Sequence, residues 1–255
     1  MKRILALALA LMIASAIPAV AEMTADEIIT KHIEAYGGAK AMGDVKTMTM
    51  KGSMFAQGMP LDLTAYIVLP GKSFMQVSAN GMVMYAAGTN GKDAWATQMG
   101  QTFILEGKDK ADLESQAEQF TLLDYKKKGG TAKFLGEDLV KGAKAYKVEY
   151  VSAKNDTTTY FFDAATYYIV REKTASSNTS FSDHKSAGGI VYPFKINSQM
   201  QAGGQSVQQM ITIDSIGVNV PIADSLFVMP KNAAPMPKAP TPAETGNTPA
   251  EGTGK

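Results

Sequence analysis

Few residues in this chain have the types and spacing that catalysis needs. The 255 residues include two histidines, His32 and His184, and no cysteine. Asp183 and His184 are adjacent, and adjacent strand residues point to opposite faces, so a strand here excludes the aspartate–imidazole hydrogen bond of a triad. His32 falls within a helical pattern, where packing or solvent exposure is commoner than metal binding. The histidines therefore give no support for acid–base or metal chemistry.

Sequence motifs for nucleophiles and cofactors are also missing. The chain contains no Gly-Xaa-Ser-Xaa-Gly elbow, no His-Glu-Xaa-Xaa-His pair, no phosphate-binding glycine loop and no dinucleotide fingerprint. A glycosidase with paired carboxylates needs no fixed spacing, so that alternative stays open without positive support. The formal net charge is +1, and the one basic block is 126–128, which argues against nucleic-acid binding. We predict a protein that is not an enzyme and holds no cofactor or metal.

Methionine is the unusual feature of the composition. Eight of the sixteen methionines fall between Met48 and Met99, mostly in segments that alternate like strands. Unbranched thioether side chains adapt to irregular apolar partners, although any single methionine can simply fill the core. Each buried methylene contributes roughly 0.8 kcal/mol, so a dry surface suffices to hold an acyl chain. We predict a hydrophobic ligand cavity lined by Met48, Met50, Met54, Leu61, Leu63, Met82, Met84, Trp95, Phe103 and Phe120.

The first 21 residues have the three-part order of a secretory signal peptide. Two basic residues precede an apolar run from Ile4 to Ile13, and Ala19-Val20-Ala21 ends the segment. The alternative is a membrane anchor, but the run is shorter than the roughly 20 residues that span a bilayer. We expect cleavage after Ala21 and an exported chain that does not span the membrane.

The other end of the chain has the composition of a disordered tail. Residues 231–255 contain five of the eleven prolines, mixed with Ala, Thr, Gly and Glu. Such a segment buries too little apolar surface to offset its conformational entropy. We expect one folded domain over residues 22–230, followed by this tail.

Two segments of the domain have helical periodicity. Thr24 and Glu27 form a capping box, apolar residues follow at helical spacing, and Gly37-Gly38 supplies the stop. A second helix is predicted over about residues 110–127, where Leu113, Ala117 and Phe120 gather towards one side. We expect both helices to lie against a sheet.

Most of the remaining chain alternates with the period of a strand. Met48, Met50 and Met54 share one face, and the segment 190–196 alternates Ile, Tyr, Phe and Ile with other residues. Asn80-Gly81 and Asn90-Gly91 suit tight hairpin turns. About ten or eleven sequential strands must twist and curl. The predicted fold class is α+β, mainly antiparallel β: a strongly curved sheet or incomplete β-barrel, with helices covering its concave face.

Short pieces spread over residues 24–230 resemble one family. Their order and spacing are similar to those of the LolA-like outer-membrane lipoprotein-sorting proteins, in Tyr36-Gly37-Gly38, Asn90-Gly91 before Ala94-Trp95, Leu122 to Lys126, Ala145 to Val148, Tyr160 to Ala164, Phe181 to His184, Tyr192 to Ile196 and Val220 to Phe227. The resemblance implies a periplasmic half-barrel that handles lipids or lipoproteins beneath a helical lid.

Three functions are compatible with these observations. The leading one is a soluble periplasmic carrier that binds acyl chains of a lipid or lipoprotein, for lipoprotein sorting or envelope lipid transfer. The second is a non-catalytic envelope sensor or adaptor that binds a partner protein through the open face of the same fold. The third is a module that accompanies an envelope peptidase.

Overall fold

The computed structural model describes residues 23–56, 58–202 and 205–236. The predicted signal peptide and most of the predicted tail lie outside these residues. In the described part there are three α-helices and a short 3₁₀ helix: α1 (Ala25–Ala35), α2 (Gly38–Asp44), α3 (Gly107–Ala117) and η1 (Asp224–Phe227).

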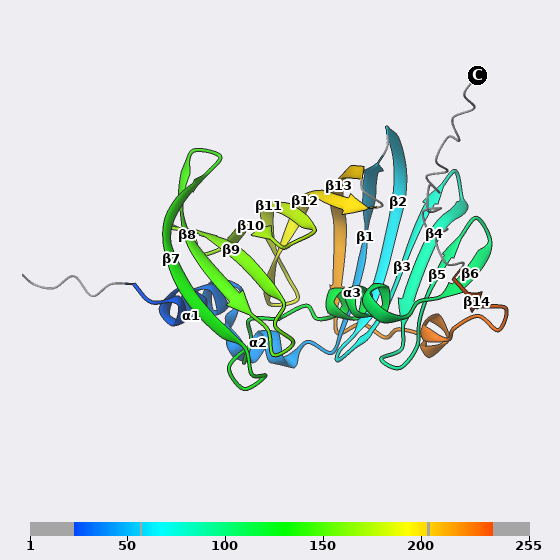
Figure 1. Cartoon of the computed structure of the whole chain (residues 1–255), viewed down its shortest axis with the longest axis horizontal. Coiled ribbons are helices and arrows are strands. Elements are labelled where there is room, and N and C mark those ends of the chain that lie inside the picture. Colours follow the sequence, from blue (N-terminus) through cyan, green and yellow to red (C-terminus); the bar gives the residue numbers. More distant parts are fainter. Residues whose placement is uncertain (1–22, 57, 203–204, 237–255) are drawn as a thin grey trace, which may run out of the picture.

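One curved sheet forms the body of the molecule (Figure 1). Its strands, in the described residues, are β1 (Thr47–Ala56), β2 (Met59–Val68), β3 (Lys72–Ala79), β4 (Met82–Thr89), β5 (Ala94–Gln98), β6 (Gln101–Ile104), β7 (Thr131–Val140), β8 (Ala143–Val151), β9 (Thr157–Asp163), β10 (Ile169–Lys173), β11 (Ser177–Ala187), β12 (Ile190–Ala202), β13 (Gln205–Val218) and β14 (Ala234–Pro235). The predicted fold class is confirmed, with fourteen strands instead of ten or eleven.

Two antiparallel meanders join to make this sheet. The strand order is β14-β6-β5-β4-β3-β2-β1-β13-β12-β11-β10-β9-β8-β7, and the contact between the halves is the antiparallel pair β1–β13. Among the strands of the described residues, only the short β14 pairs in parallel, with β6. Strands β14 and β7 stand at opposite edges, so the sheet is an open half-barrel.

Helix α1 forms where its capping box predicts. The Thr24 hydroxyl accepts a hydrogen bond from the Glu27 backbone N–H at 3.2 Å, and the Glu27 carboxylate accepts from the Thr24 N–H at 2.8 Å. Gly37 follows with φ 112°, a left-handed conformation suited to glycine. The buried face of α1, with Ile28 and Ile29, packs against strands β8 and β9.

The predicted second helix is shorter than expected. Helix α3 ends at Ala117, and residues 118–129 run in turns. Leu122 and Tyr125 pack with α1, whereas Phe120 and Leu123 pack against the cluster around Met48. Asp124, between them, has φ 55°. Because the side chains of this segment serve two clusters, a single helix face does not satisfy both.

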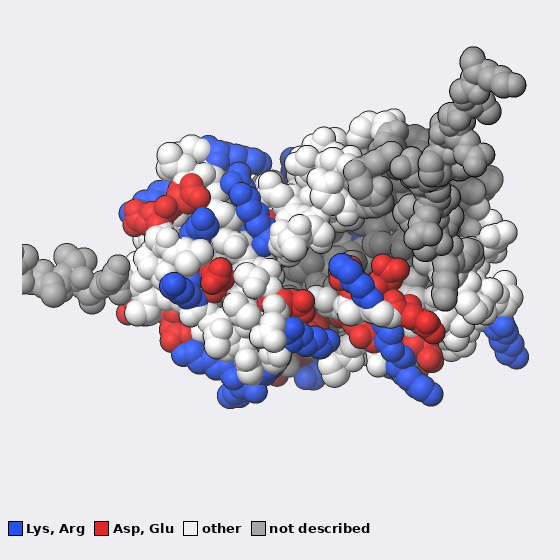
Figure 2. Space-filling view, viewed as in Figure 1, with Lys and Arg blue, Asp and Glu red and all other residues white. Residues whose placement is uncertain are grey.

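Helix α3 lies across the sheet with its charged side outward. Leu113 packs with Ala87, Ala94 and Ala96 of strands β4 and β5. On the exposed side Lys108 pairs with Asp112 at 2.5 Å. Figure 2 shows charged side chains gathered over the left half of the molecule and along its lower edge near α3. The helix therefore separates the sheet from solvent over β3 to β5.

Candidate functional site

The concave side of the sheet is the candidate site, and we call it the inner face. It is the side that carries Met48, Met50 and Met54 on β1, because alternate strand residues share a face. Met48 and Met50 are buried beneath Phe120 and Leu123 of the segment after α3. The turn segment after α3 therefore closes part of the inner face and makes it a packed core.

Further along the same strands the inner face stays partly open. Five apolar residues lie side by side on five neighbouring strands, and each is directly opposite the next in the hydrogen-bonded register. All five are partly exposed. We call this set the apolar row: Phe181, Ile196, Ile211, Met54 and Leu61.

The ten residues predicted to line a cavity are distributed over several environments. Met48, Met50 and Leu63 are buried core residues, whereas Met54 and Leu61 belong to the apolar row. Phe103 on β6 and Phe120 after α3 are partly buried. Met82 is 69% exposed beside the Asn80-Gly81 turn, and Met84 is the extra residue of a bulge between β3 and β4.

Trp95 is placed apart from the others, which corrects its grouping with the methionines. Strand β5 directs Ala94 and Ala96 to the inner face, so Trp95 between them points to the outer face. There it lies over Gly88, whose added Cβ would fall 2.6 Å from the indole, and Phe74 lies alongside. The alternation of side chains along the short strand β5 decides which face Trp95 occupies. Its apolar character does not, because both faces bury apolar residues here.

The two histidines, which belong to distant segments, meet around Tyr36. The His32 ring centroid lies 4.2 Å from that of Tyr36, and the His184 centroid lies 6.1 Å from it. Burial lowers the pKa of His32 to about 4 and also lowers the pKa of His184. Both imidazoles are therefore favoured in the neutral form, as packing residues of a core.

This histidine cluster does not have the geometry of a catalytic triad. Asp183 has φ 56°, and its carboxylate lies 3.0 Å from the ammonium of Lys185. The His184 ring instead stacks on Tyr168 at 4.7 Å. In the described ranges, no group of three or more His, Asp or Glu side chains is arranged to hold a metal ion.

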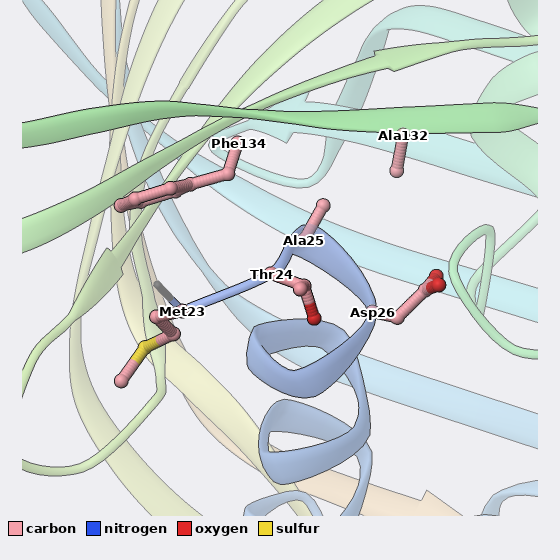
Figure 3. A pocket seen from close by; sticks show the side chains of 6 residues that line it. All are labelled: Met23, Thr24, Ala25, Asp26, Ala132 and Phe134. Carbon is pink, nitrogen blue, oxygen red and sulfur yellow. The ribbon is translucent and has the colours of Figure 1, made fainter. Parts of the chain in front are cut away.

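A shallow pocket of about 350 Å³ opens at the start of α1 (Figure 3). Ala132 and Phe134 of β7 form one wall, and residues 23–26 form the other. The Asp26 carboxylate accepts hydrogen bonds from the Tyr125 hydroxyl and from the Lys126 ammonium. The Thr24 hydroxyl accepts one from the Glu27 N–H in the capping box. The polar groups of this pocket therefore already have protein partners.

Comparison with known proteins defines the fold. No protein-family model and no curated protein sequence matches the chain. Among solved structures, it is similar to a DUF1329 family protein from Desulfovibrio piger, with a TM-score of 0.56 and 12% identity over 80% of this chain and 96% of that one.

Two further structures are similar to the same extent. A domain from Vibrio parahaemolyticus, described as an outer membrane lipoprotein-sorting protein, has a TM-score of 0.56 and 9% identity, covering 79% of this chain and 94% of its own. A LolA superfamily protein from Nitrosomonas europaea has a TM-score of 0.54 and 11% identity, covering 81% of this chain and 98% of its own. The chain has a LolA-like fold.

The predicted resemblance is thereby confirmed for the fold. The apolar row of this LolA-like fold includes three residues that the sequence did not single out as ligand-lining: Phe181, Ile196 and Ile211. The alternation of residues 190–196 indicates which face of its strand Ile196 occupies. Only the cross-strand register shows that it stands in line with Met54. Within the described residues, no helix has the length and apolar character required to cross a membrane.

Proposed function

We propose that this protein is a soluble, non-catalytic periplasmic carrier that binds acyl chains of a lipid or lipoprotein on its inner face. It serves lipoprotein sorting or lipid transfer within the envelope. The two structures described as a lipoprotein-sorting domain and a LolA superfamily protein support this class of function through their shared fold.

The apolar row is the observation that carries the proposal. Neighbouring strands lie about 4.8 Å apart, so five side chains in register extend over roughly 19 Å. Their partial exposure leaves apolar surface that an acyl chain would cover, at roughly 0.8 kcal/mol for each buried methylene. Exposed apolar surface of this continuity is typical of binding sites.

Substitution on the two faces of the paired strands β13 and β1 tests the proposal. Ile211→Asp and Met54→Asp place a carboxylate on the apolar row, and we expect each to weaken binding of a neutral fluorescent acyl probe at least about tenfold. Met210 and Phe55 are their sequence neighbours on the outer face, each 44% exposed, so Met210→Asp and Phe55→Asp are matched controls. Equal probe binding by all four folded variants would refute the proposed ligand surface.

The location is a separate part of the proposal. We propose that residues 1–21 are removed on export, which releases the chain into the periplasm. The mass of protein recovered from the periplasmic fraction is expected to correspond to a chain that begins at Glu22. Recovery of the intact chain from the membrane fraction would contradict release.

A partner protein is the alternative occupant of the same face. The apolar row would also accept an apolar segment of an envelope protein, as expected of a sensor, an adaptor or a peptidase-associated module. Native mass spectrometry of protein purified from its own envelope distinguishes these cases. A bound lipid supports the carrier, whereas one stoichiometric protein without lipid supports the alternative.

A further inference from the structure

A second set of side chains crosses the inner face beside the apolar row. These residues also lie directly opposite one another on five neighbouring strands, β9 to β13. Thr179, Ser198 and Gln209 stand two positions from Phe181, Ile196 and Ile211, so both sets share one face. We call this set the polar row: Tyr160, Glu172, Thr179, Ser198 and Gln209.

Glu172 is the one charged member of the polar row. It lies between Tyr160 and Thr179 and is partly buried. Burial raises the pKa of its carboxyl group above the ordinary value. Within the described residues the carboxylate has neither a hydrogen-bond donor nor an ion-pair partner. A carboxylate that loses water without gaining a partner is destabilised, and a ligand can supply the missing group.

The cations next to Glu172 in sequence do not reach it. Arg171 and Lys173 lie over the ring of Phe161, at 5.5 and 5.7 Å from its centroid. Phe161 belongs to the cluster with Val140 and Ala145, on the outer face. No lysine or arginine is a member of the polar row or the apolar row. Glu172 therefore places a negative charge on the inner face, and neither row contains a positive side chain to balance it.

We propose that the polar row binds the head of an amphiphile whose acyl chain lies on the apolar row, and that Glu172 selects heads bearing an amine over carboxylate heads. This inference rests on the proposed function and names the class of its ligand. Residues two apart along a strand are separated by about 6.7 Å, so one molecule spans both rows. Thr179 lies directly opposite Glu172, and its hydroxyl is 2.9 Å from that of Ser198 on the next strand, so the row offers further hydrogen bonds to the head.

Amphiphiles of equal chain length and different head charge test the selection. Dodecylamine, dodecanol and dodecanoate are each titrated against the full chain loaded with a neutral acyl probe. From the displacement of the probe, we expect the amine to bind roughly tenfold more tightly than the alcohol and the carboxylate to bind most weakly. Glu172→Gln keeps the size of the side chain and is expected to bring the three affinities within about threefold.

Glu149 provides the matched control on the outer face. It lies on β8 between the inward residues Val148 and Tyr150, so Glu149→Gln removes a carboxylate from the opposite side of the sheet. This variant is expected to retain the amine preference. Thermal unfolding verifies that both variants are folded.

The outcomes separate this inference from the proposed function. If dodecanol binds and the amine has no advantage, or if Glu172→Gln leaves the advantage unchanged, the selection is refuted while the carrier stands. If dodecanol itself does not bind, the proposed function fails. Should Glu172→Gln not fold, the wild type decides: acidification that protonates Glu172 must abolish the advantage of the amine over the alcohol.

A final binding experiment distinguishes two natural sources of an amine linked to an acyl chain. A short-chain phosphatidylethanolamine represents a membrane lipid, and an acylated peptide with a lysine side chain represents a lipoprotein. Binding of either that depends on Glu172 supports the amine class, and the tighter ligand identifies the source. Binding of both without dependence on Glu172 refutes the selection.

Discussion

The Nδ1 atom of His32 lies 3.0 Å from the backbone carbonyl oxygen of Tyr167, a contact that joins α1 to the turn between β9 and β10. The carbonyl can only accept, so Nδ1 carries the proton. His32 is 3% exposed, and the neutral ring packs between Tyr36 and Phe162. Docking of α1 is therefore sensitive to protonation of this ring.

Acid is expected to weaken the fold through His32. The pKa of His32 falls from an ordinary 6.5 to about 4 because of burial, so the unfolded chain binds the proton more tightly. The stabilisation is complete above about pH 6.5 and is lost as the pH falls towards about 4, by up to roughly 3 kcal/mol. Urea unfolding of the wild type and His32→Gln at about pH 7 and about pH 4.5 measures it. An identical pH dependence in both proteins would contradict this role.

Asp26 is expected to hold the segment after α3 against α1. Its carboxylate accepts hydrogen bonds from the Lys126 ammonium and from the Tyr125 hydroxyl, and these lower its pKa. Asp26→Asn should lower the free energy of unfolding by about 1 kcal/mol, a value that allows for the partial solvent exposure of Asp26. The double variant with Tyr125→Phe should lose less free energy than the two single variants added together. The exposed Lys40–Asp44 pair is the control, and Asp44→Asn should change little. Strict additivity of the Asp26 and Tyr125 substitutions would exclude their coupling.

A methyl group at Gly52 is expected to break the junction of the two half-sheets. Its Cβ would lie 2.1 Å from the backbone oxygen of Thr212, beside the bulge in the β1–β13 pair. Gly52→Ala should lose at least roughly 2 kcal/mol, because backbone atoms must move. Gly43, in α2, has no neighbour within 4 Å of an added Cβ, so Gly43→Ala should be neutral or stabilising by up to about 1 kcal/mol. Thermal melts that rank the two variants in the opposite order would refute the argument.

Trp95 is expected to report on folding and to be insensitive to the ligand. It is the one tryptophan of the chain and is 1% exposed, so its emission should be blue-shifted in the native state. It faces away from the apolar row, and saturation with an unlabelled acyl ligand should leave its emission nearly unchanged. Phe181→Trp in a Trp95→Phe background places the fluorophore on the apolar row itself and should respond to the ligand. A large response of Trp95 itself would place the ligand on the outer face.

Local patterns predicted the elements of this fold well. The capping box of Thr24 and Glu27 located the start of α1, and both residues of the Asn80-Gly81 turn have positive φ, as a tight hairpin requires. These features depend on neighbours within a few residues. The extent of α3 was predicted less well, because its end depends on distant clusters that draw Phe120 and Leu122 in different directions.

The candidate site was predicted only in part for the same reason. Met54 and Leu61 follow from alternation, whereas Trp95 lies on the other face and Glu172 was not singled out. A carboxylate in a strand is ordinary in a sequence. Its significance here comes from inner-face neighbours and from the outward direction of Arg171 and Lys173.

By itself, the sequence determined the mostly antiparallel, curved class of the fold, the capped first helix and the shortage of catalytic groups, because period, capping and composition are local properties. Only the tertiary structure decided which side chains stand in line. The β1–β13 pair brings residues more than 150 positions apart into register, and the apolar and polar rows exist only across such pairs. Register is a property of several strands together, so no single segment specifies it.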